Sequence, residues 1–223
     1  MIKTVKRKPK PKPKPKPKPK PKPKPKFSEI ILIGNGPSIL DYNFGKEIDK
    51  FKEIIRFNKY VISDFEKHIG TRTDIWVRNA VLNPKRDNKS FKKIFIWAKR
   101  ANKQFITSDN CTLLLNSCVL NEVKKYEVKK RLSTGLNFIL WMTKKQNKKI
   151  VIHGFDFFGE DTPTSKHYFS EQSRRCTVKE HSGITEKKII EDLIKEKKVM
   201  WLSQFLDDAR KKEIRRKNRK SER

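Results

Sequence analysis

Several features that would define common protein classes are missing from this sequence of 223 residues. The longest apolar runs, Ile30 to Ile33 and Phe138 to Met142, are far shorter than the roughly 20 residues that span a bilayer. The amino terminus carries lysines and prolines in place of the apolar core of a secretion signal. We therefore expect no transmembrane segment, no signal peptide and a cytoplasmic location.

Cysteine is scarce, and common metal-binding patterns are missing. The three cysteines, Cys111, Cys118 and Cys176, form no Cys-x-x-Cys pair, which argues against a disulfide framework or a structural zinc site. No two histidines are four positions apart, and there is no Asp-x-Asp to hold the divalent ion that many nucleotide-sugar transferases use. We expect no metal and no other cofactor.

Acidic residues are few relative to basic ones: 25 Asp and Glu against 56 Lys and Arg give a formal net charge of +31. Residues 1–26 carry 13 basic residues and no acid, and residues 209–223 carry nine basic and two acidic residues. Residues 27–208 keep a net charge of +11. These changes in composition predict a Lys-Pro tail (1–26), one domain long enough to bury a core and to be catalytic (27–208), and a basic C-terminal tail (209–223).

The Lys-Pro tail uses nine of the twelve prolines in a strict alternation from Lys8 to Lys26. Proline removes amide donors and fixes φ, and the lysines repel one another, so we expect an extended, disordered segment without a core. It is either a spacer or an electrostatic docking segment for an anionic membrane surface or nucleic acid, the latter without sequence specificity.

The domain alternates short apolar runs with helical patterns. β-branched and aromatic content predicts strands at residues 29–33, 53–57, 75–77, 94–97, 149–153 and 199–202. Helical patterns cover residues 112–130, 134–146 and 185–197, and a further helix is expected from Arg210. Strands interleaved with helices predict an α/β fold, a single Rossmann-like nucleotide-binding domain with a mainly parallel sheet.

Candidate site residues follow the strands, because ligands of such sheets bind beyond the carboxyl ends of the strands. The first strand runs into Gly34-Asn35-Gly36-Pro37-Ser38, where two glycines allow close approach to a ligand. Ser38 can cap the next helix and direct its amides at a phosphate. The second strand ends in Arg56-Phe57-Asn58 without the acid of a dinucleotide site, so NAD is disfavoured.

Two more segments carry polar side chains at expected element ends. The third strand is followed by Asn79, and the segment Arg131-Leu132-Ser133-Thr134-Gly135 precedes a helix. The first turn of that helix offers amides, hydroxyls and a nearby guanidinium to an anion. An ordinary Ser or Thr cap beside a solvated arginine is the alternative interpretation.

Three of the four histidines lie between positions 153 and 181. His153 ends a predicted strand and leads into Gly154-Phe155-Asp156, so we expect it to be a satisfied core residue. His167 and His181 lie in polar segments and are candidates for acid-base chemistry near neutral pH.

In their order along the chain, these segments resemble the sialyl motifs of the animal-type sialyltransferases of glycosyltransferase family 29. The region Ile31 to Trp76 is similar to the large motif and the region Ser133 to Asp156 to the small motif. His167-Tyr168-Phe169 resembles the third motif, and His181 with Glu186 the very small motif. The pair Pro37-Ser38 and the run His181 to Glu186 are also similar to bacterial sialyltransferases of family 42.

The resemblance implies a variant of the GT-A glycosyltransferase fold and an inverting, metal-independent transfer of sialic acid from CMP-sialic acid to a hydroxyl of an acceptor glycan. His181 matches the general base, while His167 and Tyr168 match positions beside the departing phosphate. A single leaving phosphate can be stabilised by hydrogen-bond donors and a helix start without a cation. The motif residues matched to substrate binding are Asn35, Gly36, Ser38, Asn58, Asn79, Arg131, Ser133, Thr134, Gly135, Gly154, Phe155 and Asp156.

Some positions differ from these families. Residues 28–30 and 146–149 contain no cysteine, so the disulfide that joins the large and small motifs of the animal enzymes is absent. Phe158 stands where the bacterial enzymes have a phosphate-binding tyrosine, and Ser170 where an acid or amide is usual. Two alternatives stay open: a basic nucleic-acid-binding protein, suggested by the net charge of +31, and a catalytically inactive family member that serves as a binding domain.

Overall fold

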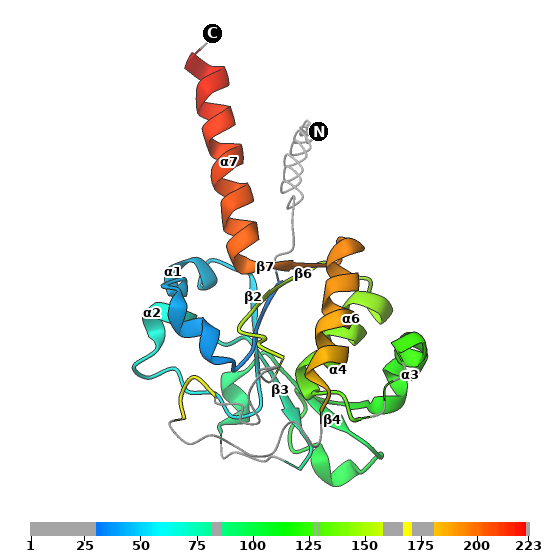
Figure 1. Cartoon of the computed structure of the whole chain (residues 1–223). Coiled ribbons are helices and arrows are strands. Elements are labelled where there is room, and N and C mark those ends of the chain that lie inside the picture. Colours follow the sequence, from blue (N-terminus) through cyan, green and yellow to red (C-terminus); the bar gives the residue numbers. More distant parts are fainter. Residues whose placement is uncertain are drawn as a thin grey trace, which may run out of the picture.

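A computed structural model describes residues 30–81, 86–126, 128, 130–157, 167–170 and 181–221. The Lys-Pro tail, Phe158 and Cys176 lie outside these described residues. The described strands form one seven-stranded sheet in the order β5-β4-β3-β2-β1-β6-β7, and every pair of neighbours is parallel (Figure 1). The strands are β1 (Ile30–Ile33), β2 (Glu53–Phe57), β3 (Ile75–Asn79), β4 (Lys93–Ala98), β5 (Cys111–Leu115), β6 (Ile150–His153) and β7 (Val199–Trp201). The predicted α/β fold is confirmed.

Alternation within the strands builds a core on each face of the sheet, because neighbouring side chains of a strand point to opposite faces. Leu32 of β1 packs in the cluster shared with the helices α4 (Thr134–Leu140) and α6 (Gly183–Lys195). Its neighbours Ile31 and Ile33 pack in the opposite cluster with α1 (Gly45–Ile48), α2 (Glu66–Ile69) and the first turns of α7 (Leu202–Ser221). The sheet is therefore covered by helices on both faces (Figure 1).

Six predicted strands are confirmed to within two residues at each end. The helix predicted at residues 134–146 is α4 followed by a π-helical turn, Trp141–Lys145, and the one predicted at 185–197 is α6. The C-terminal segment is also helical, because α7 continues without interruption from Leu202 to Ser221.

The helix predicted at residues 112–130 is wrong at its start. Cys111–Leu115 forms the edge strand β5, which pairs with β4 from Ile94 to Ala98. Short helical turns follow: η4 (Asn116–Val119), α3 (Leu120–Val123) and η5 (Lys124–Tyr126). A run of three leucines fits either structure locally, and pairing with β4 decides for the strand.

No helix among the described residues is long and apolar enough to cross a membrane.

Candidate active site

The order of the strands in the sheet has a switch point between β1 and β6. Strands β2 to β5 extend from one side of β1, whereas β6 and β7 lie on the other side. Such a switch point is where open α/β sheets bind ligands, at the carboxyl ends of the strands. The loops after β1 and β6 meet there, since the Gly34 N–H donates to the His153 carbonyl at 2.8 Å and the Gly36 N–H to the Gly154 carbonyl at 2.9 Å.

The glycines of these two loops are required by contacts within the chain. A β carbon at Gly34 would lie 2.1 Å from the Gly154 carbonyl oxygen, and one at Gly36 would lie 2.4 Å from the Asp156 carboxylate. Gly154 itself has a φ of +72°, a conformation that favours glycine. The sequence predicted close approach to a ligand, but the space beside these α carbons is filled by the loop after β6.

Asp156 holds the loop after β1 through Ser38. One carboxylate oxygen accepts the Ser38 N–H at 2.8 Å, and the other accepts the Ser38 hydroxyl. The prediction that Ser38 caps the next helix is wrong: the turn η1 (Pro37–Asp41) has Gly36 at its N-cap position and no side-chain cap. A hydrogen bond from the Ser38 hydroxyl to a charged carboxylate is stronger than one between that hydroxyl and a neutral backbone N–H. The serine therefore bonds Asp156 and does not cap the turn.

Asn35 links three loops at the carboxyl end of the sheet. Its side-chain amide nitrogen donates to the Phe57 and Lys59 carbonyls at 3.1 and 2.9 Å, and its backbone carbonyl accepts the Tyr168 N–H at 3.1 Å. The side-chain oxygen Oδ1 is buried and has no hydrogen-bond partner among the described residues. Buried polar atoms are nearly always paired, so this oxygen is suited to accept a hydrogen bond from a ligand.

Asn58 and Asn79 shape the ends of β2 and β3. Asn58 adopts a φ of +50°, and its side-chain oxygen accepts the Asn79 N–H at 2.9 Å. The Asn79 side-chain oxygen in turn accepts the Val81 N–H at 2.9 Å. Both asparagines therefore use their oxygens to hold turns.

The start of α4 is held by Glu186 from α6. The Ser133 hydroxyl accepts the Leu136 N–H at 3.2 Å and so caps the helix. The Glu186 carboxylate accepts the Ser133 N–H at 2.6 Å and the Ser133 hydroxyl at 2.8 Å. Burial raises the pKa of Glu186 to about 7, although the two bonds from Ser133 oppose that rise.

Phe155 connects the switch point with this helix start. A β carbon at Gly135 would lie 2.8 Å from the Phe155 ring, and the same ring packs edge-on against Phe57. The next loop residue, Phe157, adopts a φ of +51°, which is strained for an aromatic residue. Its carbonyl would contact a β carbon at Gly183, the first residue of α6. The loop after β6 therefore touches both helix starts.

The two candidate acid-base histidines lie on different sides of this arrangement. His181 precedes α6, and its Nδ1 is 2.5 Å from the Arg131 carbonyl oxygen. His167 is adjacent to Tyr168, whose N–H binds Asn35, and its ring stacks on Phe169. His181 thus belongs to the α4 and α6 starts, and His167 to the loop after β1.

Tyr168 and His153 are buried beneath the site. The Tyr168 hydroxyl donates to the Val61 carbonyl at 2.5 Å and accepts the Val61 N–H at 3.1 Å, and burial raises its pKa. His153 is buried as predicted, but it is not satisfied, because its Nε2 has no partner in the described part of the chain. Burial, and to a lesser extent the nearby His68, lowers the pKa of His153 to about 4.

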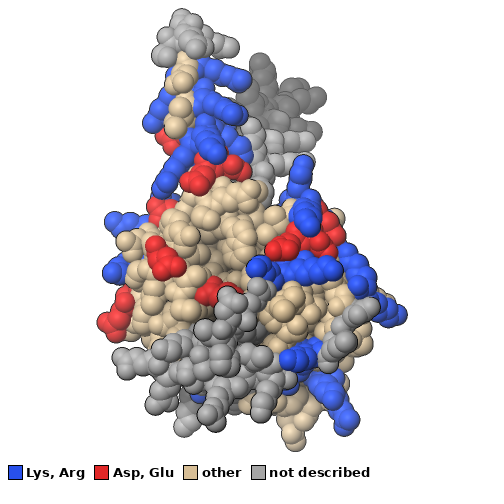
Figure 2. Space-filling view, viewed as in Figure 1, with Lys and Arg blue, Asp and Glu red and all other residues tan. Residues whose placement is uncertain are grey.

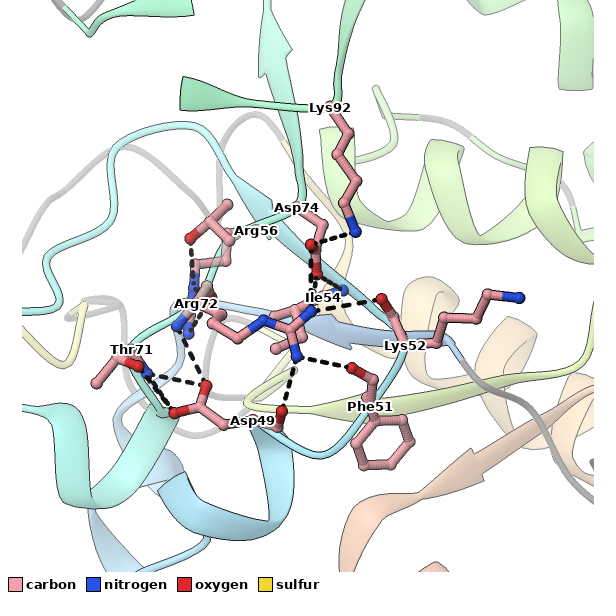
Figure 3. Close-up of polar contacts among 10 residues, drawn as sticks. Asp49, Phe51, Lys52, Ile54, Arg56, Thr71, Arg72, Asp74 and Lys92 are labelled. Carbon is pink, nitrogen blue, oxygen red and sulfur yellow. Dashed lines mark hydrogen bonds and ion pairs between the residues drawn. The ribbon is translucent and has the colours of Figure 1, made fainter. Parts of the chain in front are cut away.

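The region similar to the large motif extends to the opposite end of the sheet, where its second half forms a polar network (Figure 3). Asp49 accepts the backbone N–H groups of Thr71 and Arg72 at 3.0 and 3.1 Å. The Arg72 guanidinium donates to the Asp49 and Phe51 carbonyls and to the Asp74 carboxylate. These residues precede β2 and β3, so they support the fold far from the candidate site.

Sequence reasoning named Glu186 only as part of a motif and did not single out its role. Its burial and its bonds to Ser133 join segments that lie 53 positions apart. A carboxylate four positions after the cap Ser182 looks like an ordinary first-turn acid, so no local signal identifies this contact. Within the residues that the structure covers, no three His, Cys, Asp or Glu side chains group as a metal site.

Both the sequence and the structure are similar to known proteins. The sequence matches the model of glycosyltransferase family 29 (sialyltransferase) over residues 1–108 and 75–198. The structure is similar to a mammalian sialyltransferase in complex with Gal-beta-1-3GalNAc-ortho-nitrophenol, with 13% identity, a TM-score of 0.59, and coverage of 79% of this chain and 69% of that one.

A second mammalian sialyltransferase structure gives 13% identity, a TM-score of 0.56, and coverage of 78% and 68%. The alpha-2,3-sialyltransferase Cst-I from Campylobacter jejuni gives 16% identity, coverage of 78% and 76%, and a TM-score of 0.46. A search of the curated proteins found no match. The likeness to the mammalian structures concerns the fold.

Proposed function

Because the chain belongs to glycosyltransferase family 29, the CMP-sialic acid-dependent sialyltransferases, we propose that the switch point between β1 and β6 binds the donor and that His181 is the general base. The observation that carries this proposal is the contact of His181 with Arg131, which brings a basic imidazole to the helix start that suits an anion. The acceptor is a hydroxyl of a glycan.

The start of α4 is suited to the departing phosphate. Of the first-turn amides, the Leu136 N–H is bound by Ser133 and the Asn137 N–H by the Ser133 carbonyl. No acceptor for the N–H groups of Thr134 and Gly135 lies within the described segments. These two amides, at the positive end of the helix, would stabilise the charge that develops on a leaving phosphate.

The contact with Arg131 also sets the tautomer of His181. A carbonyl oxygen can only accept, so Nδ1 carries the proton and donates it to the Arg131 carbonyl. Nε2 is then unprotonated and can accept the proton of an acceptor hydroxyl. The backbone carbonyl thus orients the ring and makes Nε2 its basic nitrogen.

The proposed step is a single displacement. The acceptor oxygen forms a bond to the anomeric carbon of the sialyl group while the bond from that carbon to the phosphate oxygen of CMP breaks. The hydroxyl proton moves to His181 Nε2, and CMP leaves with the bonding electron pair. Attack opposite the leaving group inverts the anomeric configuration, and none of these transfers needs a metal ion.

The remaining matched residues would form the donor pocket. The unpaired Oδ1 of Asn35 would accept a donor hydroxyl or amine, and the amide nitrogens of Asn58 and Asn79 would donate to the nucleotide. Contacts between the loops after β1 and β6 would hold these loops together, and the matched residues in the loops are Gly36, Ser38, Gly154, Phe155 and Asp156. His167 and Tyr168 would support the side of the site next to Asn35.

Two measurements test this proposal. Thermal unfolding with CMP, CDP, UDP and NAD should show a selective rise of the melting temperature with cytidine nucleotides. Release of CMP from CMP-sialic acid should then be followed with a galactose-terminated acceptor, of the kind in the similar mammalian complex, and also without acceptor. EDTA should leave the rate unchanged.

His68 provides a matched control for the base. Its Nδ1 also lies 2.5 Å from a backbone carbonyl oxygen, that of Tyr42, but it is on the α2 side of the sheet. We expect His181→Gln to lower transfer by at least 100-fold with unchanged CMP affinity, and His68→Gln to retain transfer by the folded protein. Binding of CMP without any transfer or hydrolysis would instead identify an inactive binding domain, and no binding of cytidine nucleotides would reject the proposed site.

A further inference from the structure

The last helix, α7, leaves the body of the protein after two turns. Leu202 is fully buried, and Phe205 packs against Phe51 with their ring centroids 5.3 Å apart. From Ala209 to Arg219 every side chain is exposed. Figure 1 shows this part of the helix extending beyond the folded domain.

In this exposed part, the cations that form ion pairs and those that do not lie on different sides of the helix. Arg210 pairs with Asp207 at 3.8 Å, and Lys217 pairs with Glu213 at 3.0 Å. The other five cations have no ion pair within the described chain, and we call them the basic face: Lys211, Lys212, Arg215, Arg216 and Arg219. At 100° per residue they fall within an arc of about 140° of the helix surface. Figure 2 shows Lys and Arg gathered along the projecting helix.

The basic face is unfavourable for an isolated helix. Lys211 and Arg215, Lys212 and Arg216, and Arg215 and Arg219 are each four positions apart, where like charges destabilise a helix. Ile214, the one apolar residue between positions 210 and 219, lies on the opposite side. No other described element packs on the basic face to offset this repulsion, so an external anionic surface would stabilise it.

The position of α7 separates the basic face from the candidate active site. Phe51, which packs on Phe205, precedes β2, so α7 passes the amino ends of the strands. Ile30, the first described residue, begins β1 at that same end, opposite Glu53. The cations of α7 therefore lie toward one end of the sheet, and the switch point lies at the other.

We propose that the basic face of α7 docks the protein on an anionic phospholipid surface. Basic side chains near such a surface bind by summed charge and need no pocket. Single-stranded nucleic acid is less well suited, because proteins bind it with aromatic side chains among the cations, and neither residues 209–221 nor residues 1–26 contain an aromatic residue. Docking through this end leaves the switch point accessible to donor and acceptor.

The experiment is sedimentation of the full chain with vesicles of phosphatidylcholine alone or with 30% phosphatidylserine, at about 0.1 M salt. Binding is expected only to the anionic vesicles and should weaken as salt increases. The test variant Lys211→Gln/Arg215→Gln removes two cations of the basic face, and the matched variant Arg210→Gln/Lys217→Gln removes one Arg and one Lys from the opposite side. We expect the first to lower vesicle affinity about ten-fold or more and the second less than three-fold.

The outcomes separate this proposal from the proposed function. Both variants should keep the CMP response of the parent, because neither pair lies at the switch point, and vesicle binding is measured without donor. Equal losses in the two variants, or no loss in either, would overturn the proposal, since charge alone or the tail would then account for binding. Tighter binding of a 20-nucleotide single-stranded RNA through the same face, competing with vesicles, would also overturn it.

Discussion

Polar side chains at the two ends of the parallel sheet differ in how completely they are hydrogen-bonded. At the amino end, all four carboxylate oxygens of Asp49 and Asp74 accept hydrogen bonds. At the carboxyl end, Asn35 Oδ1 and His153 Nε2 are buried without a partner in the described chain. Toward the amino end, Nη1 of Arg56 is the corresponding exception, although Nη2 of the same guanidinium donates to the Ile69 and Arg72 carbonyls. Left-handed backbone occurs at both ends, at Asn58, Gly154 and Phe157 after strands and at Gly70, Asn147 and Lys197 before strands.

This difference separates stability from function. A network in which each buried charge has donors stabilises the native state and has no capacity left for a ligand. A site must keep unpaired polar atoms for its ligand, and it is stable only because the rest of the fold enforces it. Substitutions at the two ends should therefore affect different measurements.

The largest effect is expected from Asp74→Ala at the amino end. Burial alone would raise the pKa of Asp74, but the bonds from Lys92, Ile54 and Arg72 outweigh it and the pKa lies below its ordinary value. Removing the carboxylate leaves the Ile54 N–H without its acceptor and removes the charged acceptor of the Arg72 guanidinium, so the free energy of unfolding should fall by about 3 kcal/mol. Urea denaturation measures this loss, and the folded variant should bind CMP within two-fold of the parent; a ten-fold weaker affinity would contradict the separation.

Glu186→Gln tests a group that serves both stability and the site. The carboxylate has its pKa raised from 4.5 to about 7, so its contribution to stability is complete below pH 4.5 and is lost as the pH rises through 7. At about 1.4 kcal/mol per pKa unit, the loss reaches about 3 kcal/mol. Unfolding free energies measured from pH 4 to 8 should fall more steeply for the parent than for the variant, and parallel curves would show that Glu186 does not titrate in this range.

Asn35→Ala addresses the carboxyl end. The variant loses the Oδ1 acceptor and the bonds to Phe57 and Lys59, so CMP affinity measured by calorimetry should fall about ten-fold. Stability should fall by about 1 kcal/mol, much less than for Asp74→Ala. An unchanged affinity together with a large stability loss would mean that Asn35 serves the fold alone.

The smallest effect is expected from Lys92→Ala. Its ammonium lies 2.7 Å from Asp74, but the side chain is 64% exposed, and water replaces such a partner readily. The free energy of unfolding should change by less than about 1 kcal/mol, because Arg72 and the Ile54 N–H still bind Asp74. A loss near that of Asp74→Ala would show that the lysine, and not the buried donors, holds the carboxylate.

Much of the fold could be predicted from the sequence. β-branched residues concentrate in β1, β2 and β6, and the apolar stripe of α6 repeats at helical spacing, so local pattern identifies these elements. β5 could not be recognised, because Leu113 to Leu115 suit a helix as well as a strand and only the edge of β4 selects between them.

The candidate site was predictable as a set of residues and not as an arrangement. The order of the motif-like segments pointed to Asn35, Ser133 and His181, and their roles in the site stay a prediction. The partners of the site residues carried no local signal. Ser38 looked like a helix cap and bonds Asp156 instead, and Tyr168, matched to a position beside the departing phosphate, bonds Val61 through its hydroxyl.

By itself, the sequence determined the alternation of strands and helices, the excess of positive charge at both chain ends and the chemical types of the site residues, because each of these is a property of composition or short-range periodicity. Only the tertiary structure decided that Ser38 meets Asp156 across 118 positions, that Arg131 meets His181 across 50, and that the basic helix leaves at the end opposite to the site. These contacts follow from the strand order, which sets β6 beside β1. Strand order is a result of packing the whole chain, and no local window contains it.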